Sequence, residues 1–85
     1  MNFTEFEVAA VIPVYGVEHN IQSVLDGLPS FLKHIIVVDD DSPDSSGKLV
    51  AAAAQNDRRI TLVTHSKNLG VGGAMVSGFR KALEL

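Results

Sequence analysis

Apolar runs of strand length alternate with stretches of helical periodicity along the whole chain. Runs rich in Val, Ile or Ala have the length of strands at three places: 8–14, about 35–39 and 60–64. Apolar residues spaced by three and four predict three helices: about 18–28, 44–56 and 72–85. This order favours parallel strands joined by right-handed crossovers. The predicted fold class is α/β, a Rossmann-like three-layer β-α-β-α-β-α arrangement with a parallel sheet.

The same pattern predicts which side chains are buried. The first helix should bury one stripe: Ile21, Val24, Leu25 and Leu28. The third should bury another: Ala74, Met75, Gly78, Phe79 and Ala82. Pro13 cannot donate a hydrogen bond within a ladder, so we expect it at or just beyond the end of the first strand.

The chemistry of the chain concentrates after the middle strand. Four apolar residues, Ile35-Ile36-Val37-Val38, run directly into Asp39-Asp40-Asp41-Ser42-Pro43-Asp44. These acids should lie at the carboxyl edge of a parallel sheet, where ligands bind. Ser42 and Asp44 are explained equally well as helix-capping residues. The three adjacent carboxylates repel one another, which favours a ligand-binding role for them.

Composition narrows the classes of function. The chain has 85 residues, a net charge of -3 and no cysteine. The sequence has no basic patch, which argues against a nucleic-acid partner. Because there is no cysteine, neither a disulfide nor a thiolate metal site can form. The first seven residues are acidic and lack the order of a signal peptide, and no apolar run approaches the ~20 residues of a membrane span.

Other candidate motifs are weaker. The loop Gly70-Val71-Gly72-Gly73 lacks the third glycine of the dinucleotide fingerprint and follows the third strand. It indicates either a tight turn or a backbone that approaches a ligand phosphate or sugar. The sequence contains no G-x-S-x-G motif, which argues against a serine hydrolase. The three histidines, His19, His34 and His65, lie far apart and lack the spacing of metal ligands. Three basic residues are most simply explained as solvated charges in turns: Arg58, Arg59 and Lys67.

Three stretches together resemble the nucleotide-sugar-binding half of family 2 glycosyltransferases, which have a GT-A fold. They are 11–18 (VIPVYGVE), 36–44 (IVVDDDSPD) and 68–74 (NLGVGGA). The family patterns are I-P-x-Y-N, V-D-D-x-S-x-D and N-x-G-x-x-x-A, and the likeness extends over residues 8 to about 83. The third stretch is also similar to the branch that transfers sugars to polyprenyl or dolichol phosphate.

The resemblance implies a nucleotide site. Its residues would be Pro13, Tyr15, Glu18, Asp39, Asp40, Gly70 and Gly72. Asp40 would accept a hydrogen bond from an N–H group of the base, for example uracil N3–H. Asp39 would be its structural neighbour. Two positions depart from the family pattern: Gly16 stands where Asn is usual, and Asp41 where Gly is frequent. Asp41 adds negative charge beside an anionic donor.

The resemblance also implies what this stretch lacks. Such enzymes carry a D-x-D metal motif and an acceptor site further along the chain. We therefore expect residues 1–85 to form a single partial domain with no catalytic or metal-binding residue, and no transferase activity alone. The full-length enzyme would use Mg²⁺ or Mn²⁺ and a UDP- or GDP-linked sugar. It would lie in the cytoplasm or at the cytoplasmic face of a membrane, which it would contact only through other regions.

Two alternatives remain from the sequence: a non-catalytic interaction fragment, and a receiver-like signalling domain. A receiver carries its acid pair after the first strand, whereas this first strand ends in Pro13-Val14-Tyr15. The GT-A fold also implies the sheet order third, second, first. Val8–Val14 would then be an open apolar edge, which predicts self-association through that strand.

Overall fold

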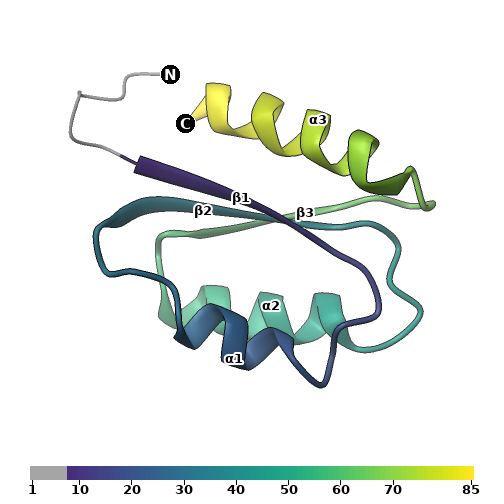
Figure 1. Cartoon of the computed structure of the whole chain (residues 1–85), viewed down its shortest axis with the longest axis horizontal. Coiled ribbons are helices and arrows are strands. Elements are labelled where there is room, and N and C mark those ends of the chain that lie inside the picture. The colour runs from purple at the N-terminus through teal and green to yellow at the C-terminus, as the bar shows by residue number, and fades with distance from the viewer. Residues whose placement is uncertain (1–7) are drawn as a thin grey trace.

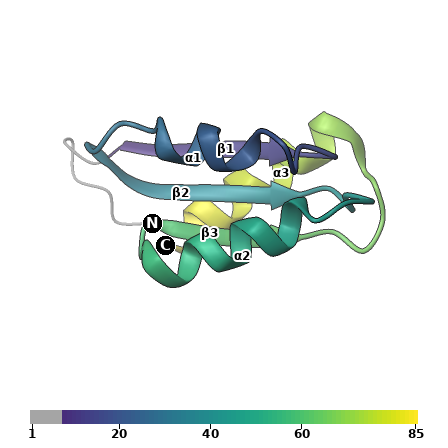
Figure 2. The same cartoon turned by 90° about the horizontal axis from the view of Figure 1, so that it is seen from below.

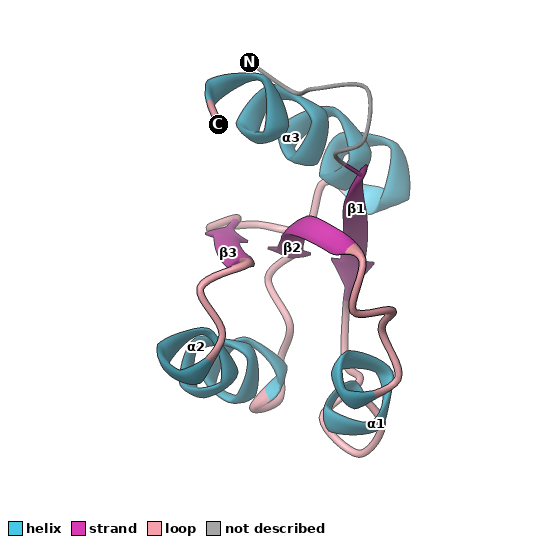
Figure 3. Cartoon of the chain, turned by 90° about the vertical axis from the view of Figure 1, so that its left-hand side faces the viewer, coloured by secondary structure: helices cyan, strands magenta, loops and turns pink. Residues whose placement is uncertain are grey.

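The computed structural model describes residues 8–85. It contains six elements in the expected order: β1 (Val8–Val14), α1 (Ile21–Asp26), β2 (Leu32–Asp39), α2 (Ser46–Asn56), β3 (Ile60–Thr64) and α3 (Gly70–Glu84). The strands form one parallel sheet in the order β1-β2-β3. Helix α3 covers one face of this sheet, while α1 and α2 cover the other (Figures 1 and 3). The predicted α/β fold class and sheet order are confirmed.

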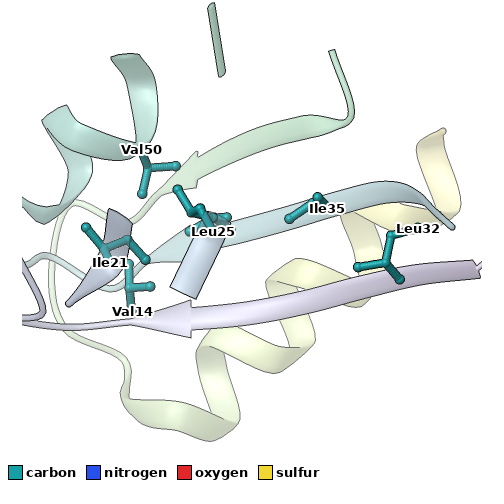
Figure 4. Close-up of a cluster of buried hydrophobic side chains, with 7 residues drawn as sticks. Val14, Ile21, Leu25, Leu32, Ile35 and Val50 are labelled. Atoms are coloured by element: carbon teal, nitrogen blue, oxygen red, sulfur yellow. The ribbon is translucent and has the colours of Figure 1, made fainter. Parts of the chain in front are cut away.

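The central strand is buried on both faces, which explains its unbroken apolar run. Ile35 and Val37 belong to a cluster with residues of α1 and α2, and Figure 4 shows most of its side chains. Ile36 and Val38 belong to a second cluster beneath α3. All four side chains have no exposed surface. Burial of each stabilises the fold by about 1.5–3 kcal/mol.

The strand register brings the carboxyl ends of the strands to one edge (Figure 2). Val14 pairs with Asp39, and Asp39 pairs with Thr64. Pro13 lies inside β1, one residue before its end, and pairs with Val38. The expectation that Pro13 ends the strand was therefore wrong by one residue. An edge strand tolerates it, because a proline lacks only the N–H that can face outward.

Two predicted burial stripes need correction. Val24 is 45% exposed and Phe79 is 57% exposed. Helix α3 contacts the sheet through a narrow row of small residues, Ala74, Gly78 and Ala82, all of them buried. Because this row allows a close approach, the neighbouring Phe79 is rotated away from the sheet. Helix α1 is only six residues long, so Leu28 follows it rather than extending its stripe.

The amino-terminal edge of the sheet is fastened by Arg59, which the sequence left as a solvated turn charge. Its guanidinium donates to the carbonyl oxygens of Pro29 (3.2 Å) and Leu32 (3.3 Å), and pairs with Asp57 at 2.8 Å. The turn before β3 is thereby joined to the turn before β2. Arg59 is a structural residue at the edge opposite the acids.

β1 pairs only with β2 among the described residues, so its outer edge is open. Self-association through Val8–Val14 stays a prediction. Within residues 8–85, none of the helices combines the length and apolar character that crossing a bilayer requires. The acidic segment 1–7 lies outside the described residues.

Candidate functional site

Two loops at the carboxyl edge are joined by hydrogen bonds between backbone and side chains. The loop after β1 donates from Gly16 N to Ser42 Oγ (3.1 Å) and from Glu18 N to Asp44 Oδ2 (3.2 Å). In return, Ser45 N donates to Glu18 Oε2 at 3.0 Å. The Pro-x-Tyr corner and the acidic loop after β2 therefore lie together, as the sequence predicts. Ser42 and Asp44 join the two loops, which goes beyond the capping role considered for them.

Ser46 is a buried residue of this junction that the sequence did not single out. Its Oγ accepts a hydrogen bond from Val17 N (2.8 Å) and donates one to Asp44 Oδ1 (2.5 Å). Asp44 Oδ1 also accepts from Ser46 N at 3.0 Å, which sets the start of α2. A serine two residues after an aspartate is too common a pattern to have revealed this contact.

We expect Ser46→Ala to destabilise the fold by about 1–3 kcal/mol, because the N–H of Val17 loses its acceptor in a part-buried position. Urea unfolding followed by circular dichroism measures this. Ser45→Ala is the matched control, since Ser45 is exposed and its side chain makes no cap hydrogen bond. Its effect should stay within about 0.5 kcal/mol. Equal effects of the two substitutions would contradict the role of the Ser46 hydroxyl.

Asp39 and Asp40 are adjacent but face opposite sides of the sheet. Asp39 turns toward α2, where its Oδ1 accepts from Ser42 N at 3.0 Å. A Cβ atom at Gly47 would lie 2.2 Å from Asp39 Oδ2, so only glycine admits the carboxylate there. Asp39 lines an open hollow of about 370 Å³ together with Asp41 and Lys48.

Asp40 turns toward α3 and is buried. Its Oδ1 accepts from Leu69 N (2.8 Å) and contacts His65 Nδ1 at 2.7 Å, while its Oδ2 accepts from Gly70 N at 2.8 Å. The Leu69 N–H, the His65 ring and the Gly70 N–H hold the pKa of this carboxyl below its usual range despite burial. Asp40 is thus ionised near neutral pH and only accepts hydrogen bonds. It also caps the N-terminus of α3.

A cavity of about 230 Å³ brings part of the predicted site together. It is lined by Pro13, Val14, Tyr15, Val17, Asp40, Val71 and Ala74. The Tyr15 side chain is half exposed at this cavity. Of the predicted residues, Pro13, Tyr15 and Asp40 therefore share one cavity, whereas Asp39 lines the other hollow.

The other predicted residues take different positions. Glu18 is not among the residues that line the cavity, and its carboxylate is bonded to Ser45. The Gly70 N–H donates to Asp40, so this glycine helps to hold the carboxylate. Gly72 faces open space, since a Cβ built there meets nothing within 4 Å. His65 and Leu69 are 25 and 29 residues from Asp40 in the sequence, and no local sequence pattern predicted their contacts with it.

The two departures from the family pattern have a backbone explanation. Gly16 has φ +64° and Asp41 has φ +60°, both in the left-handed region. Glycine, asparagine and aspartate adopt that region most readily. The loop geometry is therefore compatible with Gly16 in place of the usual Asn and with Asp41 in place of the frequent Gly.

The acidic loop does not offer a metal site. Asp39 is packed against Gly47 and bonded to Ser42, while Asp41 is exposed. In the part of the chain from residue 8 onward, no three His, Asp or Glu side chains converge to hold a metal ion. The donor set of these residues does not fit a Mg²⁺ or Mn²⁺ ion, which needs several converging oxygens.

Acid should weaken the fold through three carboxylates whose pKa values lie below the ordinary value near 3.8: Asp40, Asp44 and Asp57. The largest cause in each is a hydrogen bond, from the Leu69 N–H, the Ser46 hydroxyl and the Arg59 side chain respectively. A lowered folded-state pKa stabilises the fold above the unfolded pKa, and this contribution is lost as pH falls through the folded value. We expect the free energy of unfolding in urea to be lower at about pH 3 than at about pH 5. Equal values would contradict these contacts.

Comparisons with known proteins identify the family. The model of glycosyl transferase family 2 matches residues 9–84. The chain is 32% identical to a UDP-N-acetylglucosamine–dolichyl-phosphate N-acetylglucosaminyltransferase of Methanococcus voltae, with 88% of this chain and 35% of the relative covered. It is 33% identical to an undecaprenyl-phosphate 4-deoxy-4-formamido-L-arabinose transferase of Yersinia pestis, with 88% and 25% covered.

A solved structure shares the fold. The mannosyltransferase PcManGT of Pyrobaculum calidifontis, in complex with GDP-Man and Mn²⁺, superposes with a TM-score of 0.79 at 22% identity, over 89% of this chain and 24% of that one. The chain thus spans about a quarter to a third of the length of these relatives. Because the family model matches nearly all of it, the chain belongs to glycosyltransferase family 2.

Proposed function

We propose that this chain binds the nucleotide of a nucleotide sugar, as the donor-binding part of an enzyme that transfers the sugar to a polyprenyl phosphate. The observation that carries the proposal is the cavity that Pro13, Tyr15 and the ionised Asp40 share at the carboxyl edge of the sheet. The names of the two relatives support the acceptor class, since both act on a polyprenyl-type phosphate.

The chemistry of the cavity suits a base. Asp40 Oδ1 already has two hydrogen-bond partners, whereas Oδ2 has one. Since each carboxylate oxygen can accept two hydrogen bonds, Oδ2 can still accept one from a base N–H such as uracil N3–H or guanine N1–H. Tyr15 presents an exposed ring beside it, on which a base can stack. Val14, Val17 and Val71 supply apolar walls.

The remaining parts of the reaction are assigned to other regions of the enzyme. A divalent cation, Mg²⁺ or Mn²⁺, would neutralise the diphosphate leaving group, and the solved relative with GDP-Man and Mn²⁺ supports this need. We infer that this stretch acts as a single partial domain and that transferase activity needs the other regions as well. We place the full-length enzyme in the cytoplasm or at the cytoplasmic face of a membrane.

Calorimetric titration of the 85-residue chain with UDP, GDP, CDP and ADP tests the proposal. We expect UDP or GDP to bind with a dissociation constant between about 10 μM and 1 mM, since one charged hydrogen bond and a stacking contact are available. Tyr15→Ala should weaken binding about 10-fold. The exposed substitution Gln55→Ala, on the far end of α2, is the control.

Two results would contradict the proposal. Absence of binding by all four nucleotides at millimolar concentration would favour a non-catalytic interaction fragment. Transfer of a radiolabelled sugar by residues 1–85 would contradict the assignment of catalysis to other regions.

A further inference from the structure

His65 connects the proposed base acceptor to α3 through a chain of three side chains. His65 Nδ1 lies 2.7 Å from Asp40 Oδ1, and His65 Nε2 lies 2.7 Å from Ser77 Oγ. The side chains of His65 and Asp40 are only 10% and 6% exposed. The backbone of His65 is held as well, because its N–H donates to Asp39 O at 2.9 Å. The imidazole therefore has one fixed orientation between the end of β2 and the middle of α3.

The roles of the ring nitrogens follow from their partners. Asp40 is ionised and can only accept, so His65 Nδ1 carries a proton. In the neutral ring, Nε2 is then the acceptor for the hydroxyl of Ser77. Asp40 thus selects the tautomer in which Nδ1–H points at the carboxylate, and the Ser77 hydroxyl, which can donate or accept, gives the ring a second hydrogen bond.

This arrangement has the order of a nucleophilic triad but not its setting. Ser77 lies in the interior of α3 and does not line the cavity beside Asp40 or the hollow beside His65. The hydroxyl of Ser77 is instead hydrogen-bonded to His65 Nε2. The chain of contacts consequently acts inward, on the carboxylate of Asp40.

We propose that His65 is the positioning residue that orients the Asp40 carboxylate for the nucleotide base, and that Ser77 holds the His65 ring in place from α3. This inference rests on the proposed function of Asp40 as the base acceptor. His65 Nδ1–H and Leu69 N–H together occupy Oδ1, and Gly70 N–H occupies half of Oδ2. A single acceptor direction remains, which defines where a base N–H can bind. Without His65, Oδ1 regains a free lone pair, and only the N–H groups of Leu69 and Gly70 hold the carboxylate.

Two substitutions separate positioning from mere packing. His65→Asn keeps an N–H donor close to the position of Nδ1, whereas His65→Leu keeps volume and removes the donor. We expect His65→Leu to weaken binding of the preferred nucleoside diphosphate about 10-fold or more, and His65→Asn to restore most of it. Ser77→Ala should weaken binding about 3-fold, because the His65 ring loses its hydrogen bond to α3. His19→Asn, on an exposed histidine, is the control and should bind like the unmodified chain.

The ring nitrogens can be observed directly. In ¹⁵N-labelled unmodified chain without nucleotide, NMR should report a protonated Nδ1 for His65, because this nitrogen faces the Asp40 carboxylate. This measurement needs no destabilising variant, so it decides even if His65→Leu does not fold. A protonated Nε2 with a bare Nδ1 would overturn the proposal.

The outcomes also separate this inference from the function beneath it. If the unmodified chain binds a nucleotide and His65→Leu binds it equally well, or if His65→Asn binds no better than His65→Leu, the role of His65 is wrong while the proposed function stands. If the unmodified chain binds no nucleotide, the proposed function and the role of His65 both fall.

Discussion

Asp40→Ala is expected to lower the free energy of unfolding by about 3 kcal/mol or more and to abolish nucleotide binding. The substitution leaves three donors without an acceptor: His65 Nδ1–H, Leu69 N–H and Gly70 N–H. Each buried donor left unpaired costs about 1–3 kcal/mol, although relaxation and water recover part of that. Urea unfolding measures the stability, and calorimetric titration measures the binding.

Asp41→Gly is the matched control for this charge removal. Asp41 is the next residue, is exposed, and has φ +60°, a backbone conformation that glycine adopts without strain. Its loss should leave stability within about 1 kcal/mol, and removal of its charge should leave nucleotide binding equal or tighter. If Asp40→Ala and Asp41→Gly behave alike, the capping and binding roles of Asp40 are wrong.

Gly78→Val is expected to destabilise the fold by about 3 kcal/mol. A Cβ at position 78 would lie 2.2 Å from Val11 Cγ1, far inside the normal carbon separation of about 3.5–4.0 Å, and 3.3 Å from Val38 Cγ2, slightly inside it. Helix α3 must then move away from the sheet, and overpacking of this kind costs about 1–3 kcal/mol or more. Gly78→Ala should cost less, since alanine adds one methyl group and favours the helix by about 1 kcal/mol.

Gly72→Val in the same helix controls for helix propensity. A Cβ there meets nothing within 4 Å, so stability should change by less than about 0.5 kcal/mol. Thermal and urea unfolding of the three variants provide the comparison. Equal effects of valine at positions 72 and 78 would show that contact with Val11 does not determine the distance between α3 and the sheet.

The parts of the fold that sequence predicts are those set by local pattern. The unbroken apolar run of β2 predicts a strand buried on both faces, and the acids after it predict a polar edge, because both properties belong to consecutive residues. Periodicity failed at Phe79, where α3 carries apolar residues on more than one side. The choice of side depended on the close approach that Gly78 allows, which is a property of the packed pair.

The site shows the same division. Alternation along a strand implies that Asp39 and Asp40 face opposite sides, so their separation into two hollows was within reach of the sequence. The partners of Asp40 were not, since His65 and Leu69 come from a loop that only the folded sheet brings alongside. The hydrogen bond of Ser46 likewise comes from a distant residue, Val17, 29 positions away.

The sheet is fastened at both ends by contacts between side chains and backbone. At the amino edge, Arg59 holds the carbonyl oxygens of Pro29 and Leu32, and at the carboxyl edge Ser42 and Glu18 join the two loops. With both edges held, neighbouring strands cannot slide past one another without breaking several hydrogen bonds. A nucleotide would meet a cavity already shaped for it, and its rate of association would be limited by diffusional encounter instead of by rearrangement of the protein.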